Sequence, residues 1–238
     1  MKIRRLPDID LARIAPMPSR EKRNALEAFK LGIVTITYAP VRSRLPDLFN
    51  VQPALFGEAA PTDWDTVERL VTRQCRSDDE KVANLLVASA LHQFANDHDI
   101  FSRQHDFYPM AMRVGQQVEY WLRLVTLVDD SPMVLFVDPR RSRRLSEVGR
   151  RFAFSMMHER IRVADPDMSE VRLGIVQLGA VKDGRRVPRL YTDERAELYN
   201  FDDLEAMVGE TYEIWRDVSE RRDDETRRKA SGTRGPLI

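Results

Sequence analysis

The chain has 238 residues, of which 42% are hydrophobic and 32% are charged, as is typical of a soluble globular protein. This length predicts one domain with additions, or two small domains. Lysine plus arginine and aspartate plus glutamate number 38 each, so only local clusters of charge can argue for a nucleic-acid partner.

Several classes of protein are excluded by what the sequence lacks. The single Cys75 excludes an intramolecular disulfide framework and a cysteine-rich zinc site, and it fits a reducing compartment. No apolar run approaches the roughly 18 residues of a membrane helix. Met1–Arg5 leads into Leu-Pro-Asp, unlike a signal peptide. No Walker A, Rossmann, GxSxG or HExxH motif is present. We therefore expect a cytoplasmic protein with no membrane contact and no nucleotide cofactor.

The first 76 residues are expected to form an N-terminal extension. Prolines and alternating charge predict an irregular arm over 1–20, and β-branched residues predict a strand over 31–38. The other expected elements are a short helix from Ser19 to Phe29, a proline-rich ordered loop over 40–61 with Leu55 and Phe56 among its apolar anchors, and a helix from Thr62 to about Cys75.

Residues 77–218 are expected to form the core. Ser77 and Glu80 have the spacing of a capping box, which predicts a helix ending near Asp97. Alternation of apolar and polar residues over 118–125 predicts a strand, and the nearly continuous apolar run over 133–138 predicts a buried one.

The rest of the expected core is again a helix followed by strands. Ser142 or Ser146 would begin a helix reaching about Arg160, and 171–178 reads as a buried strand. A hairpin turn at 182–185 and a last helix from Asn200, with an apolar stripe, follow. Residues 219–238 are predicted to be a disordered, charged tail.

The order α, β, β, β, α, β across residues 78–178 resembles the core of the PD-(D/E)XK nuclease superfamily. Its layout is most similar to TnsA-type transposon-end endonucleases. The matching positions are Glu80 early in a helix, Gln104-His-Asp-Phe-Tyr-Pro109 before a hairpin, Glu119 in its second strand, and Asp138-Pro-Arg140 at the end of its third. The resemblance implies an α/β fold: a restriction-endonuclease-like αβββαβ core with an N-terminal extension and a C-terminal hairpin plus helix.

The same resemblance implies Mg²⁺-dependent cleavage of DNA, with Mn²⁺ as a possible substitute, by a subunit of a mobile-element or defence system. Glu119 and Asp138 would be the metal ligands, because hard Mg²⁺ prefers carboxylate oxygens. Glu80 would orient a water or complete the shell, and Arg140 would stabilise charge developing on the phosphate. The implied partners are DNA and a protein such as a transposase subunit.

Two departures from the family pattern leave a second reading open. No Pro-Asp precedes Glu119, and Arg140 stands where the family has lysine; arginine is a poor proton acceptor. The alternative to an active endonuclease is an inactive nuclease-fold protein that serves as a DNA-binding or protein-interaction scaffold. Each acid also has a simpler reading: Glu80 as a helix cap, Glu119 as a surface residue, and Asp138 as the end of a strand.

A cluster of arginines follows Asp138. Six arginines and one acid, Glu147, lie within residues 140–151. Such a cluster near a helix start suits phosphate backbones and predicts nucleic-acid contact, while the alternative is a solvated helix face. Besides Arg140, the residues concerned are Arg141, Arg143, Arg144, Arg150 and Arg151.

Overall fold

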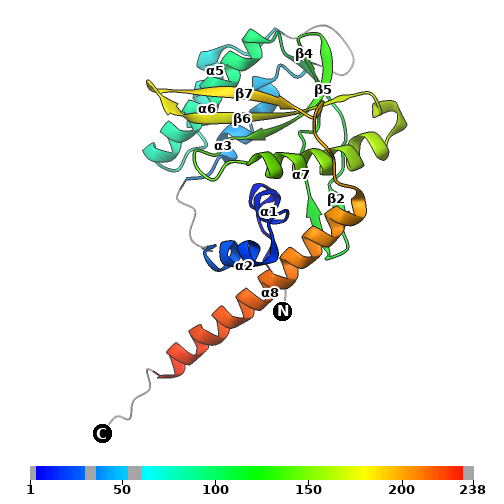
Figure 1. The fold of residues 1–238 in the computed structure, drawn as a ribbon. Coiled ribbons are helices and arrows are strands. Elements are labelled where there is room, and N and C mark those ends of the chain that lie inside the picture. The colour runs from blue at the N-terminus through cyan, green and yellow to red at the C-terminus, as the bar shows by residue number, and fades with distance from the viewer. Residues whose placement is uncertain (1–3, 30–35, 53–59, 233–238) are drawn as a thin grey trace.

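The computed structural model describes residues 4–29, 36–52 and 60–232, and it shows a mixed α/β protein (Figure 1). Its helices are α1 (Asp8–Ile14), α2 (Ser19–Glu27), α3 (Ala39–Arg42), α4 (Leu45–Leu48), α5 (Trp64–Thr72), α6 (Asp78–Asp97), α7 (Glu147–Met157) and α8 (Phe201–Gly232). A π-helical turn (His158–Val163) continues α7, and a 3₁₀ turn spans Pro166–Met168. The strands are β1 (Phe101–Gln104), β2 (Met110–Met112), β3 (Gln116–Val118), β4 (Leu124–Val128), β5 (Ser131–Asp138), β6 (Arg172–Lys182) and β7 (Arg185–Thr192).

Five strands form one mixed sheet in the order β1-β4-β5-β6-β7, and β2 and β3 form a separate hairpin. β5 and β6 run parallel, and α7 makes the crossover between them, while the other neighbours are antiparallel. The expected α/β class is therefore confirmed at this level. Among the described residues, no helix is both long and apolar enough to cross a membrane.

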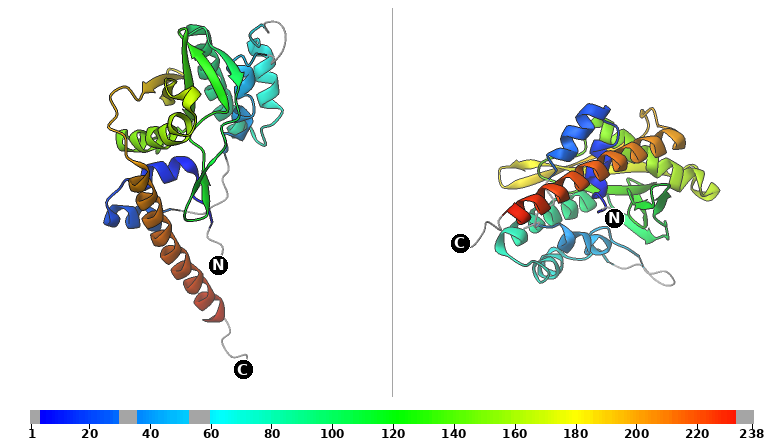
Figure 2. Two further views of the ribbon diagram at one scale, coloured as in Figure 1. Left: turned by 90° about the vertical axis from the view of Figure 1, so that its right-hand side faces the viewer. Right: turned by 90° about the horizontal axis from the view of Figure 1, so that it is seen from below.

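Each face of the sheet is covered by its own set of helices, as the figures show (Figures 1 and 2). Side chains of β5 alternate between the two faces. Val134 and Phe136 join a core with α1, α7, α8 and the β2–β3 hairpin, whereas Leu135 and Val137 join one with α3 to α6. Burial on both faces explains why β5 reads as an unbroken apolar run.

The N-terminal residues are part of the core. The prediction of an irregular arm over 1–20 is wrong for its middle part, because α1 is a helix whose Ile9, Leu11 and Ile14 are buried beneath α7 and α8. The predicted strand over 31–38 falls mostly on residues outside the described ones. The proline-rich loop contains α3 and α4, whose prolines occupy the first helical turn, where an amide hydrogen is not needed.

The sequence predicted the longer elements of the core. α6 begins after Ser77, α7 begins after Ser146, and the turn between β6 and β7 places Asp183 and Gly184 at positive φ. The predicted strand over 118–125 is interrupted, because β3 ends at Val118 and β4 begins at Leu124. The buried Tyr120 and Trp121 occupy this break and pack into the core.

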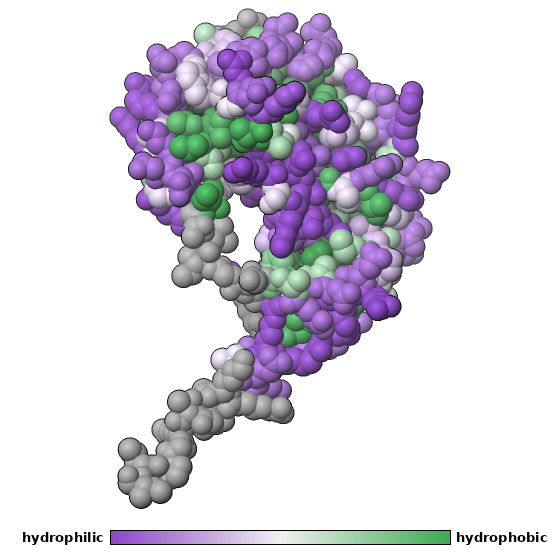
Figure 3. Space-filling model, turned by 60° about the vertical axis from the view of Figure 1, so that its left-hand side comes forward, coloured by the Kyte–Doolittle hydropathy of each residue, from purple (hydrophilic) through white to green (hydrophobic). Residues whose placement is uncertain are grey.

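The C-terminal helix is longer than expected. α8 has 32 residues and continues to Gly232, where the sequence predicted a disordered tail from 219. Its first half packs on α1, α2 and α7, and its second half projects from the body (Figures 1 and 2). Arginine, glutamate and lysine favour a helix even where no core supports it. In the view of Figure 3 this helix is mostly hydrophilic, and the main body shows a hydrophobic band together with smaller, separate hydrophobic patches.

Candidate functional site

Asp138 lies at the carboxyl end of β5, between the backbone of the following loop and the neighbouring strand β6. Its side chain is fully buried. It accepts hydrogen bonds from the backbone N–H groups of Arg140 (3.2 Å) and Leu145 (2.9 Å), and from Nε2 of Gln177 on β6 (3.1 Å). Asp138 therefore holds the 139–145 loop against the sheet.

Arg140 does not direct its guanidinium at Asp138. It forms a bidentate ion pair with Asp10 on α1, at 2.6 and 2.7 Å, and Asp10 also accepts from Arg13. Asp10 is buried, so this pair anchors α1 to the end of β5. Of Arg140, Asp138 therefore bonds only the backbone N–H, while the side chain of Arg140 neutralises the carboxylate of Asp10.

Glu119 lies in the interrupted segment between β3 and β4. Its carboxylate accepts from Nε of Arg123 at 3.0 Å. Both residues line a cleft of about 500 Å³, whose walls include Asp8, Arg42 and Trp121. Glu119 shares no hydrogen-bond partner with Asp138 or Glu80 among the described residues.

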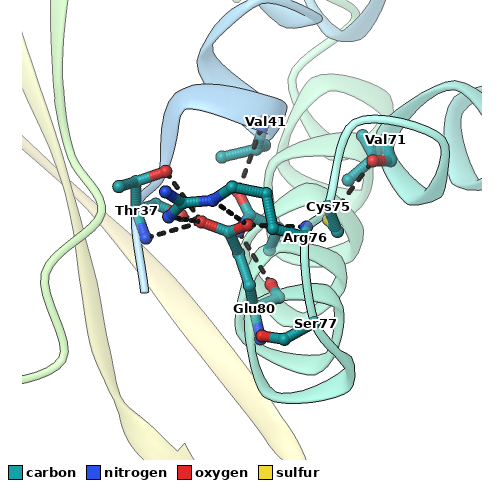
Figure 4. Close-up of polar contacts among 8 residues, drawn as sticks. Thr37, Val41, Val71, Cys75, Arg76, Ser77 and Glu80 are labelled. Atoms are coloured by element: carbon teal, nitrogen blue, oxygen red, sulfur yellow. Dashed lines mark hydrogen bonds and ion pairs between the residues drawn. The ribbon is translucent and has the colours of Figure 1, made fainter. Parts of the chain in front are cut away.

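Glu80 fastens the segment that precedes α3 onto the start of α6, as Figure 4 shows. The carboxylate is buried and accepts from the backbone N–H and hydroxyl of Thr37, both at 2.9 Å. It also accepts from the backbone N–H of Arg76 (2.8 Å) and from its guanidinium (2.7 and 3.0 Å). Ser77 caps the helix as predicted, but Glu80 bonds Arg76, one residue before the cap, instead of completing a capping box.

These contacts make the stability of the protein depend on the charge of Glu80. The hydrogen bonds from Arg76, followed by those from Thr37, hold the pKa of this carboxyl far below its ordinary value of 4.5. A carboxyl with a lowered pKa in the folded state stabilises the fold above its unfolded pKa, and that contribution is lost as the pH falls through the folded pKa.

We expect Glu80→Gln to lower the free energy of unfolding at about pH 7, and we expect this deficit to shrink once the pH falls below the unfolded pKa. Urea unfolding of wild type and variant at about pH 7 and about pH 3.5 measures the two deficits. The exposed neighbour Asp79 supplies the control, since Asp79→Asn should show a much smaller deficit. Equal deficits for Glu80→Gln at both pH values would show that the charge is not what stabilises the segment.

The acids do not form a metal site in the described part of the chain. No group of three or more histidine, cysteine, aspartate or glutamate side chains there could hold a metal ion. Protein donors occupy the carboxylates of Asp138 and Glu80, and Glu119 is paired with Arg123. This donor set does not fit a divalent cation, so we derive no step through the Mg²⁺ or Mn²⁺ that the sequence led us to expect.

The arginine cluster divides into two groups. Arg141 and Arg143 are exposed in the loop after β5 and have no hydrogen-bond partner among the described residues. Arg144 donates to the carbonyl of Leu178, and the guanidinium groups of Arg150 and Arg151 each stack on a tyrosine ring. The structure gives three of the five a local contact within the protein, and it does not test their predicted contact with nucleic acid.

One residue at this end of the sheet was missed by the sequence reasoning. Arg186 on β7 donates to the backbone carbonyls of Pro139 (2.6 Å), Arg140 (2.7 Å) and Gly179 (2.9 Å). Burial lowers the pKa of its guanidinium. No motif in the sequence marks Arg186. In the structure its neighbours Arg185 and Val187 are exposed, and the alternation of side chains along β7 turns Arg186 to the opposite, buried face. Arg186 and Asp138 hold the same loop from two sides.

Comparisons with known proteins identify relatives over almost the whole chain. Residues 9–225 match the family described as "Sliding clamp-binding bacterial toxin SocB". The "DNA replication inhibitor toxin SocB" of Caulobacter vibrioides (strain NA1000 / CB15N) is 35% identical over 232 residues, which cover 98% of this chain and 97% of the relative. No solved structure matches the chain.

These relatives overturn the family and function predicted from the sequence. The likeness to PD-(D/E)XK and TnsA-type endonucleases rested on a few acids within two fifths of the chain, whereas the toxin family matches residues 9–225. The predictions of a DNA endonuclease, of a role in transposition, and of DNA and a transposase subunit as partners are therefore wrong. Helix and strand order and isolated acids are shared by unrelated functions, so they could not distinguish the two families. The chain belongs to the SocB family of sliding clamp-binding bacterial toxins.

Proposed function

We propose that this protein inhibits DNA replication by binding the sliding clamp, and that it acts in the cytoplasm, where replication takes place. The main support for this proposal is the family match over residues 9–225, together with the 35% identity to a replication inhibitor toxin across nearly the full length of both chains. A protein that occupies the clamp prevents replication proteins from using the same surface.

The contacts of the acids support binding rather than catalysis. Asp138, Arg140 and Glu80 connect the 139–145 loop, α1 and the segment before α3 to the body of the protein. Of the readings that the sequence left open, a non-catalytic protein that acts through a protein partner agrees best with these contacts. The elements α6, β1, β4, β5, α7 and β6 follow one another in this order along the chain, and β5 and β6 are parallel. We propose that they form a restriction-endonuclease-like core, and that this core serves as a scaffold for binding the clamp.

The sequence after Gln52 supplies apolar side chains suited to a groove on a partner. The backbone N–H of Gln52 donates to the carbonyl of Ser102 on β1, so Gln52 lies at this edge of the sheet. The sequence then reads Pro53-Ala-Leu-Phe56. Short segments of a chain can bind a protein partner by placing such side chains in its pockets. Large apolar and aromatic residues commonly supply most of the binding energy of an interface.

The chain offers a matched comparison for this segment. Phe101 on β1 and Leu127 on β4 are register partners, and their exposed fractions are 40% and 42%. They therefore form a second leucine–phenylalanine pair, presented flat on two neighbouring strands. We expect the double variant Leu55→Ala with Phe56→Ala to bind purified sliding clamp about 100-fold more weakly than wild type, and Phe101→Ala with Leu127→Ala to change binding less than about threefold.

Isothermal titration calorimetry of the full chain and both double variants against the clamp measures these affinities. Expression of each variant in cells, with incorporation of labelled thymidine as the readout, measures inhibition of replication. If only the Phe101 and Leu127 variant loses binding, the function stands and the contact lies on the sheet edge. If wild type does not bind the clamp, the proposed function is wrong.

A further inference from the structure

A hollow beside α7 has no role in the contacts described above. It measures about 420 Å³ and lies between α7 and the segment that joins β7 to α8. Three arginines line it: Arg150 and Arg151 from α7, and Arg195 from the joining segment. We call this feature the arginine hollow.

Two of the three guanidinium groups are held in place by aromatic rings. Arg150 lies 3.9 Å from the ring centroid of Tyr191, and Arg151 lies 3.9 Å from that of Tyr199. Tyr199 is itself fixed to α7, because its backbone N–H donates to the hydroxyl of Ser155 at 2.9 Å. Stacking of this kind fixes the plane of a guanidinium. Nη1 of Arg150 also donates to the carbonyl of Leu145 (3.3 Å) and to Oε1 of Gln177 (3.5 Å), so only its other nitrogens are left for an anion.

The three arginines of the hollow form no ion pair within the described part of the chain. No carboxylate there pairs with Arg150, Arg151 or Arg195, and Nε of Arg151 is buried without a hydrogen-bond partner. Two other largely buried arginines do have such partners: Arg140 pairs with Asp10, and Arg162 pairs with Asp193. A buried donor without a partner costs free energy, so its presence indicates a ligand that supplies the acceptor.

The lining also limits which anion can bind. Glu147 and Glu197 lie among the same lining residues, and neither is paired with an arginine. Their negative charges offset part of the attraction that the three arginines exert on an anion. A ligand with several negative oxygens close together gains most, because each guanidinium can donate two parallel hydrogen bonds to it.

We propose that the arginine hollow binds a small molecule that carries adjacent phosphate groups. Arg195 and Arg151 contact the phosphate oxygens from opposite walls, and Arg150 supports the charge from the α7 side. The size of the hollow fits a compact metabolite. This site is independent of the clamp contact, so its failure would leave the proposed function untouched.

Inorganic pyrophosphate is the probe that tests this site. Titration calorimetry of the full chain with pyrophosphate should show saturable binding, and Arg195→Gln should weaken it at least tenfold. Arg195 is exposed and has no hydrogen-bond partner among the described residues, so its replacement leaves folding intact. Arg151→Gln should also weaken binding. Arg143→Gln, which removes an exposed arginine outside the hollow, should change the affinity less than twofold.

Three outcomes would overturn the inference. The first is that wild type does not bind pyrophosphate. The second is that Arg143→Gln weakens binding as much as Arg195→Gln, which would indicate general attraction of anions to the surface. The third is that a glutamate-rich peptide binds in an Arg195-dependent manner while pyrophosphate does not, which would assign the hollow to an acidic protein segment.

Discussion

Replacing Asp138 by alanine should destabilise the protein by about 3 kcal/mol. The substitution leaves the buried backbone N–H of Leu145 and the amide of Gln177 without their acceptor, and an unsatisfied buried donor costs about 1–3 kcal/mol. In a chain of this size such a loss lowers the melting temperature by roughly 6–12 °C. Thermal unfolding followed by circular dichroism measures it.

The same variant distinguishes a structural acid from a catalytic one. Acids assembled for catalysis are often held at a cost to stability, so their removal is frequently neutral or stabilising. Asp138→Ala at or above wild-type stability would therefore contradict the role that we assign to Asp138. Asp224→Ala, on the exposed part of α8, is the control and should stay within about 0.5 kcal/mol of wild type.

Replacing Trp215 by alanine should cost about 3–5 kcal/mol, the range for large aromatic residues removed from a core. Trp215 is fully buried on α8 and meets the ring of Phe29 edge-to-face at 5.8 Å. Its Nε1 donates to the carbonyl of Arg4 at 2.9 Å, and Arg222 lies 5.6 Å from its ring centroid. The variant therefore loses the contacts that hold the N-terminal residues and α2 against α8.

Urea unfolding measures this loss, and two further variants on α8 locate its cause. Trp215→Phe keeps the aromatic contact but loses the hydrogen bond to Arg4, so it should retain more stability than the alanine variant. Arg216→Ala changes an exposed neighbour and should have little effect. A small loss for Trp215→Ala would mean that α8 is not an integral part of the core.

The fold was predictable where the signals were local. The cap at Ser77, the cap at Ser146 and the apolar run of β5 each lie within a few neighbouring residues, and each predicted its element. α1 was missed because its seven residues lack a side-chain cap and are stabilised by contacts with α7 and α8. Such short helices depend on tertiary packing more than on their own sequence.

The site was less predictable because its partners are distant in the chain. Asp138 and Arg140 are two residues apart, as the sequence reading required, but the guanidinium of Arg140 pairs with Asp10, 130 residues away. Glu80 bonds Thr37, which is 43 residues away. A sequence shows that acids and cations are present and in which order, but not which of them neutralise one another.

The function of the protein could not be predicted from its residue types alone. The acids follow the order of a nuclease family, yet similar arrangements of elements serve many unrelated functions. Leu55 and Phe56, which we propose to contact the clamp, have no titratable group and form no charged motif. We could propose this contact only once the family had indicated a protein partner.

Titration of the purified full chain against purified bacterial sliding clamp tests whether this protein acts through the clamp. We expect saturable binding with a dissociation constant in the micromolar range or tighter, and competition between this chain and replication proteins that use the same clamp. Absence of binding at clamp concentrations of about 100 μM, by a chain shown to be folded, would contradict this expectation.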